Sequence, residues 1–393
     1  MNHSHRFVLA ALLVAATTVR ADSALDELVA VALANAPEAA AARATAEAAR
    51  RRVGPAATLP DPFLSLTWQR EEPFDVMVSQ PIPWPGKLAL ARSAAASEAR
   101  EVESGVIARA NLTIEARVRN AWYDLVLARA IDRILEDRRE SATQIEASVR
   151  ERYAAGLAVQ QDVLRAQVEL ARIDELTAAQ AATIVSRRAE LNRLAGRAQD
   201  TAIDTPNELP GDDAVPAADV VIASMAGRSP ELAASRQAIE TGRIRVELAK
   251  KNFLPDFVVS GSSMRQVGAG ISLPIFVRQR QQNQLAEAQA QMRARTADAD
   301  VVSRELELRT RERLAQLEAA LRIGRLYRDR ILPLDELSLE SALASYQAGK
   351  VPFITVLDAL NTLFNDRVLH AGRLAESAKW RVAINEASLG GMR

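Results

Sequence analysis

Few side chains in this sequence are of the types that perform catalysis or hold a metal ion tightly. Among 393 residues there is no cysteine, and two of the three histidines, His3 and His5, lie at the N-terminus. The missing cysteine excludes disulfides, thiolate metal sites, a cysteine nucleophile and a lipidated N-terminal cysteine. His370 follows Asp366 by one helical turn without a further ligand at suitable spacing, so we interpret it as a packed or solvated histidine. With no second histidine in the rest of the chain and no GxSxG elbow, the sequence predicts no enzyme, no cofactor and no resident metal site.

The charge balance excludes another class of function. The chain carries 50 Lys and Arg against 50 Asp and Glu, a formal net charge of zero. Proteins that bind the phosphate backbone need an excess of positive charge, so we expect no nucleic-acid partner. Glycine and proline number 16 each, about 4% apiece and below their usual shares of ~7% and ~5%. This scarcity predicts long, uninterrupted elements.

The N-terminus has the pattern of an export signal. A short polar and basic start ends at Arg6, an apolar run covers residues 7–19, and Val19-Arg20-Ala21 is a small-x-small cleavage pattern. The apolar run has 13 residues, against the ~20 that a spanning helix needs. We therefore expect residues 1–21 to be a signal peptide. No other stretch approaches the ~18 apolar residues of a transmembrane helix, so any membrane crossing must be made by strands.

The rest of the chain contains two copies of one unit. Separated motifs recur at a shift of 193 residues, and one motif recurs at 195. The pattern predicts a first repeat over 22–198, an acidic linker over 199–216 and a second repeat over 217–393. The matching motifs are residues 36–38 with 229–231, 79–82 with 272–275, Tyr153 and Gly156 with Tyr346 and Gly349, and, at a shift of 195, Leu59-Pro60-Asp61 with Leu254-Pro255-Asp256.

Each repeat is predicted to run as a helix, a strand pair, a very long helix, a tight turn and a further helix. We expect a rod of roughly 50 Å over residues 24–58 and one of roughly 100 Å over residues 86–153. The second long helix, residues 276–346, is interrupted only by Pro333. Apolar residues at helical spacing, such as Val118, Trp122 and Leu125, predict sideways packing of these helices. A plain solvated coiled coil is the alternative.

The two predicted β-hairpins, residues 60–83 and 255–274, alternate in polarity. In the first strand, 63–69, Leu64, Leu66 and Trp68 share one face and small or polar residues share the other. We expect the remaining strands over 76–82, 257–264 and 267–273. One apolar and one polar face suit a wall between lipid and water, but four strands are too few to close, so several chains are required. Two soluble hairpins packed on helices remain an alternative, since the strands are shorter than the ~9–11 residues of a tilted spanning strand.

These motifs together resemble the TolC-like outer-membrane efflux protein family over essentially the whole chain after the signal. The segments that carry the resemblance are residues 33–38, 59–62, 79–87, 152–156 and 345–349. The resemblance implies a mainly α protein with short β elements, a homotrimer whose twelve strands form a β-barrel in outer-membrane lipid and whose helices form a periplasmic tunnel. It also implies a periplasmic adaptor (membrane fusion protein) and an inner-membrane pump of the RND type. The ending Trp84-Pro85-Gly86-Lys87 resembles members that serve heavy-metal efflux.

The resemblance also assigns candidate site residues. It implies a pore constriction formed by Asp162, Asp358 and Tyr346. Val351 and Thr355 stand where some members have an arginine and a second aspartate, so we expect either a sparser closing network or one that uses Arg152 or Lys350 instead. The two aspartates also suit solvated helix-start positions, and the two glycines suit helix ends. The adaptor-docking turns are implied to include Tyr153, Gly156, Leu157, Tyr346, Gly349 and Lys350.

Two functions follow from these patterns. The first is a passive outer-membrane channel of a tripartite efflux system that carries substrates, with heavy-metal cations as the leading class. The alternative is a periplasmic adaptor or coiled-coil scaffold protein without a membrane-spanning barrel. We expect an adaptor to have one helical hairpin flanked by β-rich modules, so the number of hairpins separates the two.

Overall fold

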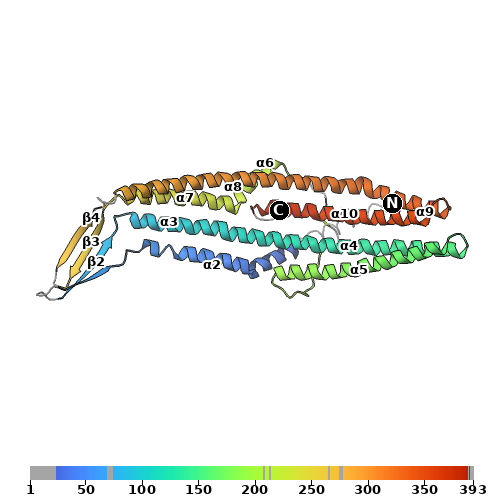
Figure 1. Cartoon of the computed structure of the whole chain (residues 1–393), viewed down its shortest axis with the longest axis horizontal. Helices are drawn as coiled ribbons and strands as arrows, with labels where there is room; N and C mark the ends of the chain where they lie inside the picture. The colour runs from blue at the N-terminus through green and yellow to red at the C-terminus, as the bar shows by residue number, and fades with distance from the viewer. Residues whose placement is uncertain are drawn as a thin grey trace, which may run out of the picture.

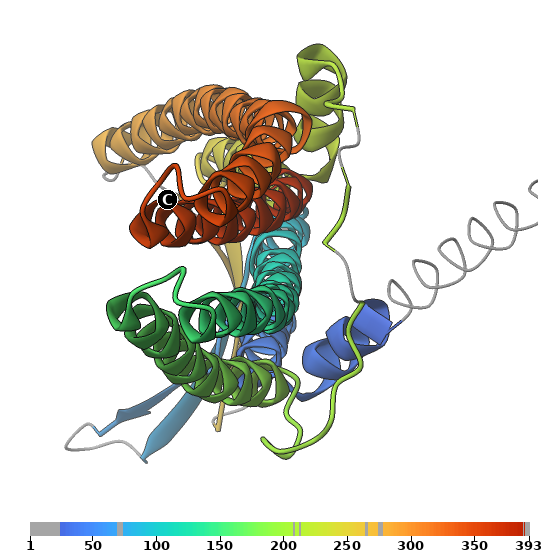
Figure 2. The ribbon, with the colours of Figure 1, turned by 90° about the vertical axis from the view of Figure 1, so that its right-hand side faces the viewer.

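The computed structural model is an elongated helical bundle with a small sheet at one end and helical turns at the other (Figure 1). It describes residues 24–68, 74–206, 209–211, 214–263, 266–273, 278–387 and 389. The predicted signal peptide, residues 1–21, lies outside the described residues. Figure 2, viewed from the turn end, shows two helical hairpins beside each other with the sheet behind them.

The first helix of each repeat breaks at a proline. Residues 24–35 are helical, Ala36 is extended at ψ 127°, and α2 runs Pro37–Arg51, followed by the short 3₁₀ helix η1, Pro55–Ala57. The predicted single rod over 24–58 is therefore wrong, because proline disfavours helical geometry at the residue before it and Ala36 is extended. The second repeat shows the same break between α6 (Ala218–Arg228) and α7 (Pro230–Lys251).

The predicted long helices are confirmed, and each contains one π-helical turn. Pro333 lies in the first turn of α9, directly after the second π turn, where its missing N–H is accommodated. None of the described helices combines the length and apolar character that a membrane crossing needs. In chain order the helices are α3 (Lys87–Val102), η2 (Glu103–Ile107), α4 (Ala108–Ala154) and α5 (Gln160–Leu194), then α8 (Arg278–Leu326), η3 (Tyr327–Ile331), α9 (Leu332–Gln347) and α10 (Phe353–Glu386).

The helices are held side by side by small and apolar residues. The predicted stripe on α4 is confirmed, since Val118, Trp122 and Leu125 are all buried. They pack with residues of the N-terminal helix and α5 in one core cluster. A second cluster lies near the turn end, where Phe353 and Phe364 of α10 contact α4, α5 and α9. Gly105, in the first π turn, lies so close to α7 that an added Cβ would stand 2.9 Å from the Cβ of Ala234.

The four strands form one antiparallel sheet in the order β1-β2-β3-β4. The predicted strands are confirmed with small shifts at their ends, and residues 69–73, 264 and 265 lie outside the described residues. Among the described residues, β1 and β4 each pair along one edge only. The strands are β1 (Phe63–Thr67), β2 (Asp75–Ile82), β3 (Asp256–Ser262) and β4 (Val267–Ser272).

The linker between the repeats is fastened to the bundle by hydrogen bonds from side chains of α4 and α5. The amide of the buried Asn192 donates to the carbonyls of Gln199 (3.2 Å) and Thr201 (2.8 Å). The guanidinium of Arg129 donates to Ile203 O (2.7 Å) and Thr205 Oγ1 (2.6 Å). These contacts tie the first part of the linker to α4 and α5.

Candidate functional site at the turn end and on the sheet

The α4–α5 and α9–α10 turns have the same backbone structure, 193 residues apart. Gly156 and Gly349 both adopt φ 70°, the left-handed conformation that glycine reaches without a Cβ penalty. Their prediction as helix ends is therefore confirmed. The paired bonds run from the amides of Gly156 and Leu157 to the carbonyls of Tyr153 (3.0 Å) and Arg152 (2.8 Å), and from Gly349 and Lys350 to Tyr346 (2.9 Å) and Ser345 (2.9 Å).

The outer surface of the turns is partly apolar. Leu157 is 65% exposed, Val159 60% and Tyr153 46%, and Lys350 is also exposed. These apolar side chains are therefore gathered at the exposed tip of the bundle. The predicted docking residues thus lie together at one end of the molecule, with Tyr346 as the buried exception.

Tyr346 and Asp162 meet across the two hairpins. The phenolic hydroxyl of Tyr346 lies 3.2 Å from Oδ2 of Asp162, to which it donates, and the tyrosine is 7% exposed. The guanidinium of Arg152 lies 5.2 Å from the Tyr346 ring centroid, and the Phe353 ring lies 5.3 Å from it. Burial, and after it the Asp162 carboxylate, raise the pKa of Tyr346, while Arg152 opposes the shift. The tyrosine therefore stays a neutral donor to Asp162.

Asp358 does not join this contact. Its side chain is exposed, and no hydrogen bond or ion pair reaches its carboxylate from the described residues. The expectation that it begins a helix is wrong, because α10 begins at Phe353 and places Asp358 in its second turn. Asp162 does lie in the first turn of α5. Of the two basic residues considered, Arg152 contacts Tyr346 and also donates to Gln347 O at 2.7 Å.

The sheet has two chemically distinct faces. The register places Leu64 opposite Val78, Gln80 opposite Val259, and Phe257 opposite Ile271. Because side chains alternate between the two faces along a strand, these six residues share one face. The residues of this face are mostly large and apolar, and several are more than half exposed. The opposite face carries mainly small or polar residues: Ser65, Thr67, Asp75, Ser79, Ser260, Ser262, Gly268, Gly270 and Ser272, with Phe63, Met77, Pro81 and Val258 among them.

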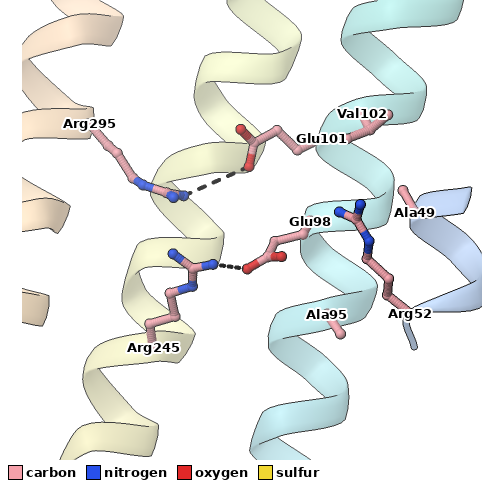
Figure 3. Close-up of a pocket in the computed structure, with 8 residues that line it drawn as sticks. All are labelled: Ala49, Arg52, Ala95, Glu98, Glu101, Val102, Arg245 and Arg295. Carbon is pink, nitrogen blue, oxygen red and sulfur yellow. Dashed lines mark hydrogen bonds and ion pairs between the residues drawn. The ribbon is translucent and has the colours of Figure 1, made fainter. Parts of the chain in front are cut away.

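Sequence reasoning missed a charged cavity below the sheet. Figure 3 shows Glu98 and Glu101 of α3 pointing toward arginines of α7 and α8, with Arg52 close by. The cavity measures about 240 Å³. Glu98 pairs with Arg245, and Glu101 lies 3.7 Å from Arg295. Burial is the main cause that raises the pKa of Glu101. No local pattern could reveal this cluster, because its ion pairs join the two repeats.

A second missed group is a buried ion pair between α4 and α5. Arg138 Nη2 donates to Glu169 Oε1 and to Asn361 Oδ1 of α10, both at 2.6 Å. The side chains of Arg138 and Glu169 are 11% and 5% exposed. The pair therefore joins three helices in the half of the bundle that leads to the turns.

The described residues contain no group of three or more acidic or histidine side chains placed to hold a metal ion. His370 is half-buried and its ring lies 6.4 Å from that of Tyr327. Burial, and then Arg328, lower its pKa. The interpretation of His370 as a packed histidine agrees with these contacts.

Comparison with known proteins gives consistent matches. Residues 221–387 match the family model of the outer membrane efflux protein. The chain is 25% identical over 316 residues to the cobalt-zinc-cadmium resistance protein CzcC of Cupriavidus metallidurans, covering 78% of this chain and 74% of CzcC.

Solved structures share the fold. The outer membrane protein VceC of Vibrio cholerae superposes with a TM-score of 0.76 at 20% identity, covering 94% of this chain and 97% of VceC. CusC superposes with a TM-score of 0.70 at 16% identity, covering 94% and 92%. An adaptor with a single hairpin flanked by β-rich modules does not fit two helical hairpins and one four-stranded sheet. The second half of the chain therefore matches the outer membrane efflux protein model, and the chain as a whole shares its fold with VceC and CusC.

Proposed function

We propose that this chain is the outer-membrane duct of a tripartite assembly that exports heavy-metal cations. The observation that carries the duct is the two-faced sheet at one end of the long helices. Its apolar residues, among them Leu64, Leu66 and Ile271, are exposed in the single chain. Such a face is stable against lipid, while the small polar face suits a water-filled interior.

Closure of this sheet needs sister chains. β1 and β4 each leave one edge unpaired, and an open edge cannot lie in hydrocarbon because its backbone groups lack partners. Three copies, as the family resemblance implies, supply twelve strands. The long helices then surround a periplasmic tunnel that continues the pore.

The turn end is the docking and constriction end in this proposal. The exposed residues Tyr153, Leu157 and Lys350 bind a periplasmic adaptor in this proposal. The adaptor links the duct to an inner-membrane pump of the RND type. The contact between Tyr346 and Asp162 holds the α4–α5 and α9–α10 hairpins together and keeps the tip narrow. Carboxylates of Asp162 and Asp358, repeated in three chains, favour the passage of cations.

The proposed cargo rests on chemistry and on the matched relative. CzcC, which matches 78% of this chain, is described as a cobalt-zinc-cadmium resistance protein. A duct passes its cargo without binding it tightly, so a resident metal site is not required of it. Carboxylates at a constriction are compatible with hydrated divalent cations.

The test is metal export by whole cells. The gene is expressed with its cognate adaptor and pump in cells that lack other outer-membrane ducts, and cell-associated cobalt, zinc and cadmium are measured by mass spectrometry. We expect a severalfold fall against cells without the chain, and no fall when the pump is omitted. Export of organic drugs with unchanged metal would contradict the cargo. Recovery of the chain as a soluble periplasmic monomer would contradict the duct.

A further inference from the structure

The junction between the two hairpins is held by an ion pair whose lysine is buried. Nζ of Lys87, a residue 9% exposed at the start of α3, donates to Oδ1 of Asp256 at 2.8 Å and to Leu254 O at 2.9 Å. The same oxygen of Asp256 accepts from the backbone amide of Trp84 at 2.7 Å. This clamp fastens the end of the first hairpin to the start of the second.

Strand pairing continues the same junction. β2 and β3 place Val78 opposite Gly261 and Ser79 opposite Ser260. The junction therefore consists of one strand pairing with a fixed register and one ion pair below it.

The repeat supplies a second set of the same residues. The residue equivalent to Lys87 in the second repeat is Arg280, 193 residues later, in the first turns of α8. The residue equivalent to Asp256 in the first repeat is Asp61, 195 residues earlier, just before β1. Both side chains are exposed, and neither has a hydrogen bond or ion pair in the part of the chain that the structure describes. The edges of β4 and β1 beside them are also unpaired. The two charged residues and the two strand edges of the junction thus have counterparts that are not joined to each other within the described residues.

We propose that Arg280 forms an ion pair with Asp61 of the partner subunit where a second copy closes the sheet, an inference that rests on the oligomeric duct proposed above. β4 of one copy pairs antiparallel with β1 of the next. Transferring the β2–β3 register through the repeat places Ile271 opposite Leu66 of the partner subunit and Ser272 opposite Ser65 of the partner subunit. Arg280 then forms the ion pair with Asp61 of the partner subunit, as Lys87 does with Asp256.

The faces of the sheet give an independent check. The transferred register was taken from β2 and β3 alone, yet it joins apolar Ile271 to apolar Leu66 of the partner subunit. A slip of one residue would instead place Ile271 opposite Ser65 of the partner subunit and exchange the lipid and water faces. The repeat and the polarity pattern therefore agree on the same pairing.

Cysteine cross-linking tests the register in the full chain in outer membranes. The protein has no cysteine, so a disulfide in the variant S65C/S272C reports only the engineered pair. Within one chain the two positions lie on the outer strands of the sheet, roughly 14 Å apart at ~4.8 Å per strand, beyond the ~7 Å limit for a disulfide. A covalent oligomer on a non-reducing gel must therefore join two copies.

Two matched variants define the result. S65C/G270C would be opposite each other after a slip of two residues, and S65C/I271C carries its cysteines on opposite faces. We expect S65C/S272C to form severalfold more covalent oligomer than either control. If native mass measurement shows trimers but S65C/G270C forms more covalent oligomer than S65C/S272C, the register is wrong and the duct stands. Membranes without any trimer would overturn the duct and this junction together.

Charge exchange tests the ion pair separately. We expect D61R and R280D each to lower the temperature at which the oligomer dissociates in detergent, and D61R/R280D to restore it. Single variants that dissociate at the wild-type temperature, or a double variant that stays at the lower temperature, would overturn the ion pair. The cross-linking result would then still decide the strand register on its own.

Discussion

The hydroxyl of Tyr346 donates a hydrogen bond to Asp162 across 3.2 Å, although 184 residues separate them in the chain. The bond connects the last turn of α9 to the first turn of α5, and Arg152 covers the tyrosine ring from α4. It therefore joins the two hairpins at the end where a tunnel of three copies would be narrowest.

Removal of this hydroxyl tests the constriction. In Y346F the Asp162 carboxylate loses its donor, and a bond to a charged group contributes about 1.5–3 kcal/mol. We expect the balance of closed and open tips to shift toward open by roughly one to two orders of magnitude. Mean conductance of single channels in planar bilayers measures the change. Y153F is the matched control, because Tyr153 holds the equivalent position in the other turn and is 46% exposed. Equal conductance of Y346F and wild type would remove this contact from the constriction.

The same contact predicts that the constriction opens at alkaline pH. Burial first, and Asp162 second, raise the pKa of Tyr346 above its ordinary value of ~10. The stabilisation is complete below the ordinary pKa and is lost as the pH rises through the raised pKa, since an ionised phenolate repels Asp162. We expect conductance to stay low at neutral pH and to rise above ~pH 10 in wild type only. The difference in phenolate absorbance between wild type and Y346F should titrate over the same pH range. If Tyr346 ionises at a lower pH than the other tyrosines, the raised pKa of Tyr346 is contradicted.

The two aspartates should differ in their effects. Asp162 has a hydrogen-bond partner, whereas Asp358 is exposed without one among the described residues. We expect D162N to raise conductance and lower cation preference, and D358N to lower cation preference alone. Reversal potentials under a salt gradient measure the preference. If D358N leaves the reversal potential unchanged, Asp358 does not line the pore.

The sequence predicted the elements well because they depend on local chemistry. Gly156 and Gly349 end their helices as expected, and polarity alternation located all four strands. The prediction for residues 24–58 failed because Pro37 disfavours helical geometry at Ala36 and so divides the rod into two helices. Within the candidate site, the family motif assigned Asp162 and Tyr346 to the same constriction, and the two side chains are hydrogen-bonded in the structure. The clamp of Lys87 on Asp256 was not predictable, because nothing local to either residue reports on a partner 169 residues away.

Docking at the turns can be mapped with single cysteines. Leu157 and Lys350 occupy equivalent positions in the two turns and are both exposed. We expect L157C and K350C to cross-link to the cognate adaptor in intact cells. V220C is the control, because Val220 is 67% exposed but lies on α6, midway along the bundle (Figure 1). Adaptor cross-links from V220C as strong as those from both turns would argue against docking at this end.

Two neighbouring ion pairs between α4 and α5 allow the contribution of burial to be measured. Arg138 and Glu169 are 11% and 5% exposed at 2.6 Å, whereas Arg139 and Asp174 are 57% and 56% exposed at 2.8 Å. E169L leaves the Arg138 charge buried without its carboxylate, which costs about 3–5 kcal/mol. D174L removes a solvent-screened pair that contributes at most about 1 kcal/mol. We expect a large fall in the unfolding midpoint of E169L and little change in D174L, by circular dichroism in detergent. Equal midpoints would mean that water reaches Arg138, because only a hydrated guanidinium could lose its partner at so low a cost.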